Sequence, residues 1–277
     1  MPGVRVVTDS ATDLPAELVA EHDVIVVPLD VRVGDADPAT TSALSGAAFW
    51  ELAASTDALA QTSAPSPGAF AAAYAAAASS GADGVVCVTL SARLSATHQA
   101  AVAGASSAEI PVAVVDSTTV TMAEGFVVLE AAEAAARGGD LATVEAAARS
   151  CIPDVEVFGA LGGLEALRRG GRIGSSQAFF GSLLAVKPIV EIRDGVVVGE
   201  SRQRTRARSL GYLVDKAVAA GPLRRLAVAH GAAPDLDTFL EMLKAARPDD
   251  KIVVTYIGPV IGAHAGPGTI GLCMQRA

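Results

Sequence analysis

Valine-rich runs of strand length recur through the first half of the chain and constrain its fold more than any other feature. They cover residues 4–8, 24–28, 85–89 and 112–116. Apolar side chains predominate in these runs without a regular alternation, which is typical of parallel strands covered by helices on both faces. Helices are predicted between them at 15–21, 46–55, 68–80 and 97–105. The first half therefore predicts an α/β domain built on a parallel sheet.

The second half of the chain has a different pattern of predicted secondary structure, in which hairpins are mixed with helices. Asp194-Gly195 separates apolar runs at 187–193 and 196–201, and an Asp-Gly pair in that position favours a two-residue hairpin turn. Further strands are predicted at 155–159, 223–229, 251–257 and 270–274, and helices at 163–169, at 175–184 and around Leu213 and Leu240. This mixture predicts an α+β domain rather than a second doubly wound sheet.

The boundary between the two parts is expected after a pair of helices. Met122, Phe126 and Leu129 recur at i, i+4 and i+7, which predicts a long amphipathic helix with Glu133 and Arg137 on its polar face. A further helix is predicted at 141–150, directly before Ile152-Pro153. The expected domains are residues 1–152 and residues 153–277.

Composition excludes several classes of protein. The 277 residues include 21 Lys and Arg against 30 Asp and Glu, and the net charge of −9 disfavours binding to nucleic acid. The longest charge-free stretch, residues 58–82, is interrupted by prolines and is too polar to span a bilayer. Cys87, Cys151 and Cys273 form no metal-binding pair, and the four histidines show no metal-ligand spacing. We therefore expect a soluble cytoplasmic protein without a metal site or cofactor.

Polar residues gather where the predicted strands end. They are Thr8-Asp9-Ser10, Thr89-Leu90-Ser91 and Asp116-Ser117-Thr118-Thr119, and the segments 61–68 and 94–97 add further hydroxyl groups. Ligands of open α/β sheets bind at the carboxyl ends of the strands. Hydroxyls beside helix starts can hold one carboxylate or phosphate, and the same residues also serve as helix caps. Both interpretations stay open at this point.

Two aspartates in the first of these segments allow a metal-binding hypothesis. Asp9 and Asp13 stand four residues apart, but a divalent cation requires more oxygen ligands than this pair supplies. Asp13 precedes Leu14-Pro15, and we expect it to cap the helix that follows.

Three further segments in the second half carry glycines or arginines. The glycine-rich segments 170–174 and 258–271 match neither standard nucleotide-binding loop. Arginines alternate at positions 202, 204, 206 and 208, which is consistent either with a solvated surface or with docking to an acidic partner.

Five segments occur in one characteristic order along the chain. They are residues 7–15, 62–68, 94–97, 170–174 together with 181–188, and 258–271. In kind and order they resemble the motifs of the DegV family, and the resemblance covers nearly the whole chain. It implies a bacterial protein that binds a long-chain fatty acid in a tunnel between its two domains. It also implies a partner, because several members present the lipid to a separate ATP-binding fatty acid kinase subunit that phosphorylates the carboxylate.

The resemblance also assigns roles to individual residues. It implies that Thr62 and Ser95 bind the fatty acid carboxylate, and that Arg172 and His264 lie near the head group or face the partner. Ser63 and Arg93 are expected to support the site. The chain departs from the family where Arg93 and Ala96 replace glycines and where Ala64 replaces a common glutamine.

Two functions are therefore weighed. The first is a non-catalytic lipid-binding subunit, whose partners are a long-chain fatty acid, a kinase subunit and, transiently, a membrane. The alternative is an acyl- or phosphoryl-transfer enzyme that uses the same hydroxyls with His264 as the base. A tunnel that buries a long acyl chain supplies tight binding without catalytic groups.

Overall fold

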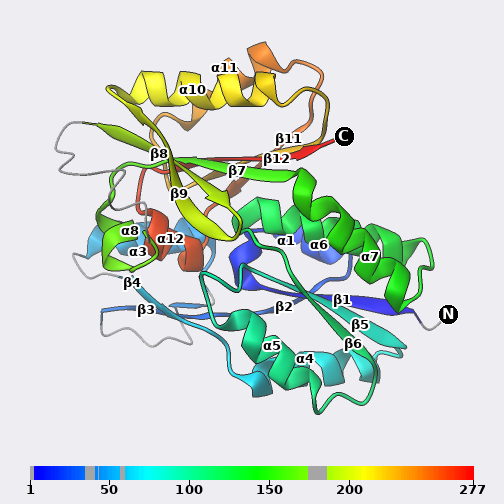
Figure 1. Ribbon diagram of the computed structural model, residues 1–277. Coiled ribbons are helices and arrows are strands. Elements are labelled where there is room, and N and C mark those ends of the chain that lie inside the picture. The colour runs from blue at the N-terminus through cyan, green and yellow to red at the C-terminus, as the bar shows by residue number, and fades with distance from the viewer. Residues whose placement is uncertain (1–2, 35–40, 43, 57–59, 174–185) are drawn as a thin grey trace.

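A computed structural model describes residues 3–34, 41–42, 44–56, 60–173 and 186–277, and it contains two stacked sheets (Figure 1). The first sheet consists of β1 (Val4–Asp9), β2 (Ile25–Val27), β5 (Gly84–Thr89) and β6 (Val112–Asp116). The strand order is β2-β1-β5-β6 and every pair is parallel. The central strand β5 is buried at all six positions, as its run of apolar residues predicts.

The second sheet is mixed. It consists of β7 (Val155–Ala160), β8 (Lys187–Arg193), β9 (Val196–Gln203), β10 (Leu223–His230), β11 (Ile252–Tyr256) and β12 (Ile270–Arg276), in the order β11-β10-β12-β7-β8-β9. β10 and β11 are parallel, and the other described neighbours are antiparallel. Asp194 and Gly195 both adopt positive φ between β8 and β9, as a type I′ turn requires. The predicted hairpin and the mixed character of this domain are confirmed.

Helices complete the layers. They are α1 (Ala16–Glu21), α3 (Gly46–Ser55), α4 (Pro67–Ser79), α5 (Thr97–Ala105), α6 (Thr121–Ala136), α7 (Leu141–Cys151), α8 (Glu165–Arg169), α10 (Arg206–Ala219), α11 (Leu236–Ala246) and α12 (Pro259–Ala265). In Figure 1, α4 and α5 cover the outer face of the first sheet, and α10 and α11 cover the outer face of the second. Within the described ranges, no helix has both the length and the apolar composition needed to cross a bilayer.

Helix α6 lies between the two sheets, and it is buried on almost every face. Val127 and Val128 pack into the core of the first sheet, whereas Met122 and Phe126 pack against Cys273 and other residues of the second. The prediction of an amphipathic helix with one solvated face was therefore wrong. A helix held between two sheets needs apolar residues around most of its circumference.

Two acidic residues near the carboxyl end of α6 reach the second sheet. Glu130 and Glu133 form ion pairs with Arg224 and Arg225, which belong to β10 of the second sheet. These ion pairs join α6 to the second sheet just beyond the apolar residues that α6 packs against it.

A short antiparallel pair, β3 (Asp30–Val33) and β4 (Ala60–Ser63), was not predicted from the sequence. Val31 lies opposite Thr62 in this pair. The helix expected at 175–184 lies outside the described residues.

Candidate functional site

A cavity of about 250 Å³ lies between the two sheets. Its wall is mainly apolar and draws on both domains. The apolar side chains that line it are Leu29, Leu90, Leu94, Val120, Val157, Leu161, Leu167, Val190, Ile192, Val197, Ile257, Val260 and Ile261. Such a cavity favours a ligand with a large hydrocarbon part.

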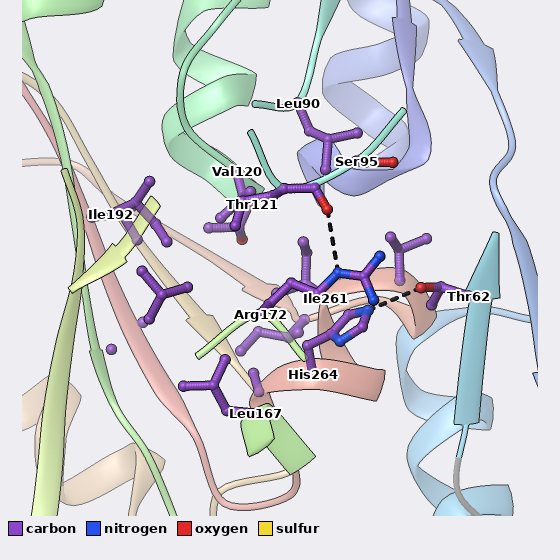
Figure 2. Close-up of a pocket in the computed structure, with 18 of the residues that line it drawn as sticks. Thr62, Leu90, Ser95, Val120, Thr121, Leu167, Arg172, Ile192, Ile261 and His264 are labelled. Carbon is purple, nitrogen blue, oxygen red and sulfur yellow. Dashed lines mark hydrogen bonds between the residues drawn. The ribbon is translucent and has the colours of Figure 1, made fainter. Parts of the chain in front are cut away.

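Polar side chains gather at one end of this cavity (Figure 2). The Oγ1 atom of Thr62 lies 2.9 Å from Nε2 of His264, and the guanidinium of Arg172 lies beside them. Ile192 of β8 is on the opposite side of the cavity from Thr62. The cavity is therefore amphipathic, with a polar end and an apolar end.

Different elements bring these polar groups together. Strand β4 carries Thr62, and helix α12 carries His264. Arg172 follows α8, and its Nε donates to the carbonyl of Leu94 at 3.2 Å across the cavity. Gly170 is required here, because a Cβ at this position would lie 2.1 Å from Nδ1 of His264.

The hydroxyl of Ser95 also lines the cavity, from the segment that leads into α5. Its Oγ lies 2.8 Å from Oγ1 of Thr97, the first residue of α5. Thr97 is fully buried, whereas Ser95 is partly exposed. A hydroxyl held in this way is available to a ligand that reaches the polar end.

Burial and the positive charge of Arg172 lower the pKa of His264 to about 4. The imidazole is therefore neutral at physiological pH. Its Nδ1 is buried and has no hydrogen-bond partner among the described residues. The permanent positive charge at this end of the cavity therefore belongs to Arg172, which suits an anionic head group.

Five of the residues predicted from the sequence line the cavity together, namely Thr62, Ser63, Ser95, Arg172 and His264. Arg93 is not among the described lining residues. It is exposed, and one of its terminal nitrogens, Nη1, donates to the carbonyl of Asp194 in the β8–β9 turn at 2.8 Å.

The domain of residues 153–277 was expected to cover the acyl chain, but the residues of the second sheet that form the wall were not identified from the sequence. Gly159 of β7 and Gly271 of β12 are opposite each other in register, and both line the cavity. Val157, Gly159 and Leu161 stand two residues apart and all line it, so this spacing was the available signal for a strand face. Thr121 and Thr269 were also missed.

Buried carboxyl groups lie behind the first domain's side of the cavity. Asp9 accepts hydrogen bonds from the backbone amides of Ala11 and Leu90, and burial raises its pKa to about 7. Burial likewise raises the pKa of Asp13 to about 7, and the pKa of Glu124 rises well above its usual value for the same reason.

The structure gives Asp13 a different role from the predicted cap. Its carboxylate accepts from Oγ1 of Thr121 at 2.6 Å and from the amide of Gly258 at 2.8 Å, and no side chain caps α1. The cap prediction was wrong because Asp13 itself adopts a left-handed conformation that turns its side chain toward α6 and α12. Within the described part of the chain, no group of His, Cys, Asp and Glu side chains is arranged to hold a metal ion.

Fold and cavity together define a class of protein, with two α/β domains that enclose an apolar cavity ending in hydroxyl, imidazole and guanidinium groups. The chain belongs to the DegV family, since the family described as "Uncharacterised protein, DegV family" matches residues 3–277.

Individual relatives match this chain over nearly its whole length. A DegV domain-containing protein of Streptomyces coelicolor is 39% identical over an alignment of 280 positions that covers 98% of each chain. Among solved structures, DegV of Bacillus subtilis, described as a fatty acid binding protein, is 30% identical and has a TM-score of 0.88 with 100% of both chains covered. A DegV family protein of Thermus thermophilus, described by its fatty acid binding, is 30% identical with a TM-score of 0.86 and covers 99% of this chain and 100% of its own.

Proposed function

We propose that this chain binds a long-chain fatty acid in the cavity, with the carboxylate at Thr62 and Ser95 and the acyl chain against the second sheet. The observation that carries this proposal is a mainly apolar cavity in which Arg172 and His264 lie together at one end, beside Thr62. The fatty acid binding described for the relatives from B. subtilis and T. thermophilus supports it.

The energetics favour such a ligand. Burying roughly sixteen methylene groups at ~0.8 kcal/mol each contributes on the order of 10 kcal/mol before the costs of association. A buried carboxylate is unfavourable unless it accepts hydrogen bonds, and two hydroxyl donors beside a guanidinium meet that requirement. The apolar wall therefore supplies affinity, and the polar end orients the ligand.

We further propose that the chain is the non-catalytic subunit of a fatty acid kinase and presents the carboxylate to a separate ATP-binding subunit. The polar end is near the surface, since Ser63 and Ala96 line the cavity and are exposed. A carboxylate at that position is within reach of a second protein. Arg172 and His264 then lie between the bound head group and the partner.

A second candidate function rests on the contact between Thr62 and His264. A hydroxyl 2.9 Å from an imidazole nitrogen is the geometry of a nucleophile and its base, as an acyl- or phosphoryl-transfer enzyme requires. However, the pKa of His264 is lowered to about 4, far below the value near neutrality at which a general base is most effective. The geometry therefore supports binding better than catalysis.

The first experiment is to identify the lipid that the protein carries. The chain is purified without added lipid and analysed by native mass spectrometry, followed by extraction with organic solvent. A co-purifying fatty acid, together with saturable binding of palmitate or oleate by the delipidated protein, is the expected result. Neither bound lipid nor binding of these two acids would contradict the proposal. Turnover of an acyl phosphate or ester by the isolated chain would support the enzyme instead.

The second experiment separates holding the lipid from presenting it. Arg172 already donates to the carbonyls of Leu94 and Gly170, and His264 is neutral, so neither is the main partner of the carboxylate. Alanine at either position is expected to leave lipid retention largely intact and to slow phosphorylation by the kinase subunit. Equal loss of retention and phosphorylation would place both residues in the carboxylate site itself.

A further inference from the structure

The start of helix α12 is fastened to the first domain by hydrogen bonds. Nε1 of Trp50 donates to the carbonyl of Ile257 at 2.8 Å, and the amide of Gly258 donates to Oδ1 of Asp13 at 2.8 Å. Oγ1 of Thr255 donates to the backbone carbonyl of Asp13 at 3.1 Å. The segment before α12 is therefore held by Asp13 and Trp50, both of which belong to the first domain.

The second oxygen of Asp13 holds a residue of the cavity wall. Oγ1 of Thr121 donates to Oδ2 at 2.6 Å, and Thr121 has a φ of 54°, which a β-branched residue rarely adopts. Asp13 is only 8% exposed, and Thr121 lines the cavity at the start of α6. One carboxylate thus ties a strained wall residue of the first domain to the first turn of α12.

The position of His264 depends on how α12 starts. His264 is six residues beyond Gly258, which corresponds to about 9 Å along a helix axis. A small change in the direction of α12 at Gly258 therefore moves the imidazole relative to Thr62, which lies on β4 of the first domain. Because Oγ1 of Thr62 is 2.9 Å from this imidazole, a displaced imidazole moves the Thr62 hydroxyl away from the proposed carboxylate. Removal of the imidazole in His264→Ala leaves the hydroxyl in place on β4.

We propose that Asp13 is a positioning residue for the head-group end of the cavity, acting through Thr121 and Gly258 without touching the ligand. The inference rests on the proposed binding of a fatty acid. It assigns Asp13 to the recognition of the carboxylate, whereas a purely structural role would affect every ligand of the cavity alike.

The test compares two ligands that share a chain and differ in the head group. Affinities for palmitate and for hexadecanol are measured with the delipidated protein, and their ratio reports the contribution of the carboxylate. Asp13→Ala is expected to lower the preference for the acid about tenfold, the equivalent of one lost charge-assisted hydrogen bond, and to leave the alcohol affinity nearly unchanged. Asp13→Asn is expected to restore the ratio, because its amide accepts from Gly258 and donates to Oγ1 of Thr121.

Asp9→Asn is the control, since Asp9 is also a buried carboxyl and its partners, Ala11 and Leu90, both lie in the first domain. It is expected to change stability without changing the ratio. Should Asp13→Ala fail to fold, Asp13→Ser takes its place, because its hydroxyl is too short to reach both partners. Trp50 is the single tryptophan of the chain, and its emission reports a shift of α12.

The outcomes separate this inference from the proposed function. A wild-type protein that binds neither ligand, or prefers the alcohol, would contradict the proposed function. A wild-type preference for the acid that stays unchanged in Asp13→Ala, or falls equally in Asp9→Asn, would overturn the role of Asp13. Equal losses for palmitate and hexadecanol in Asp13→Ala would also overturn it.

Discussion

Gly159 and Gly271 are directly opposite each other on the antiparallel strands β7 and β12, in the wall of the cavity. The next residue along the same row, on β10, is Ala229, which is paired with Gly271. Three small residues side by side leave a shallow trough across the sheet, since neighbouring strands are about 4.8 Å apart. We expect this trough to give room to the acyl end of the proposed fatty acid.

Filling the trough is expected to shorten the longest ligand that the cavity accepts. At Gly271 an added Cβ would lie 3.4 Å from the carbonyl oxygen of Ala229, an ordinary contact, so a larger side chain fits the backbone and extends into the cavity. Gly271→Val should weaken binding of stearate more than binding of laurate, as measured by competition with a fluorescent fatty acid. Gly211→Val, on α10 with nothing near its Cβ, is the control. Parallel losses for both acids would contradict a role in chain length.

Removal of the two hydroxyls is expected to weaken binding of the carboxylate without unfolding the protein. Thr62→Ala together with Ser95→Ala should cost roughly 1.5–3 kcal/mol for each hydrogen bond to the charged group, and less where water replaces it. Isothermal titration with palmitate measures the loss, and circular dichroism checks the fold. Gln61→Ala is the control, because this exposed neighbour on β4 is not a described lining residue. Unchanged affinity in the natively folded double variant would remove both hydroxyls from the site.

The buried aspartates are expected to make stability depend on pH. Asp9 has a pKa of about 7 in the folded protein against 3.8 as its ordinary value, so between these values the folded state holds a proton that the unfolded state has lost. The free energy of unfolding should therefore fall as pH rises through that window, by an amount on the order of 4 kcal/mol for this group, and level off above it. His264 has the opposite effect on the free energy of unfolding. Its pKa is lowered from 6.5 to about 4, so between these values its loss of a proton makes stability rise with pH.

A difference between variants isolates the contribution of Asp9. Urea denaturation of the wild type and of Asp9→Asn is compared from about pH 4.5 to about pH 8. The stability advantage of the wild type should decrease steadily as pH rises, because only the wild type has to bury an ionised carboxylate at position 9. An advantage that is constant, or that grows with pH, would show that Asp9 is ionised throughout this range.

The parts of the fold that the sequence predicts well are those in which local pattern and burial agree. The valine run at 85–89 is buried on both faces of the first sheet, and the Asp194-Gly195 turn needs positive φ at both residues. The β3–β4 pair was missed because Ala60–Ser63 contains no β-branched residue except Thr62 and has no buried position. Its strand conformation comes from pairing with β3, which is not a local property.

The residues of the cavity could likewise be predicted only in part from the sequence. The hydroxyl residues predicted at the ends of the parallel strands, at 8–10, 89–91 and 116–119, are not among the described lining residues. Thr62 and Ser95, which line the polar end, were assigned by the resemblance to a family rather than by their position in the sheet. The apolar wall depends on which face of the second sheet meets the first domain, and no linear motif encodes that. Gly159 and Gly271 are more than a hundred residues apart, and only the register of β7 and β12 makes them neighbours. Asp13 was interpreted as a cap because its partners, Thr121 and Gly258, lie 108 and 245 residues further along the chain.

The arginine run divides into residues with different surroundings. Arg206 is turned inward, where Nε lies 2.7 Å from Oδ2 of Asp235, and its other nitrogens donate to the carbonyls of Ala160 and Gly268. Arg204 and Arg208 are exposed. The interpretation of the run as one uniform surface patch was therefore wrong at Arg206, which joins β7 and the turn before β12 to the start of α11.

Charge reversal at the exposed pair tests whether it contributes to docking on the proposed kinase subunit. Arg204→Glu with Arg208→Glu is expected to slow association with that subunit at low salt and to have a smaller effect at high salt, because exposed charges are screened over about 8–10 Å at physiological ionic strength. Lys244→Glu with Lys251→Glu changes the net charge of −9 by the same amount at exposed positions of the second domain and serves as the control. Association rates are measured by stopped flow across a salt series. Rates equal to those of the wild type at both salt concentrations, or an equal slowing in the control, would show that Arg204 and Arg208 are solvated surface charges without a docking role.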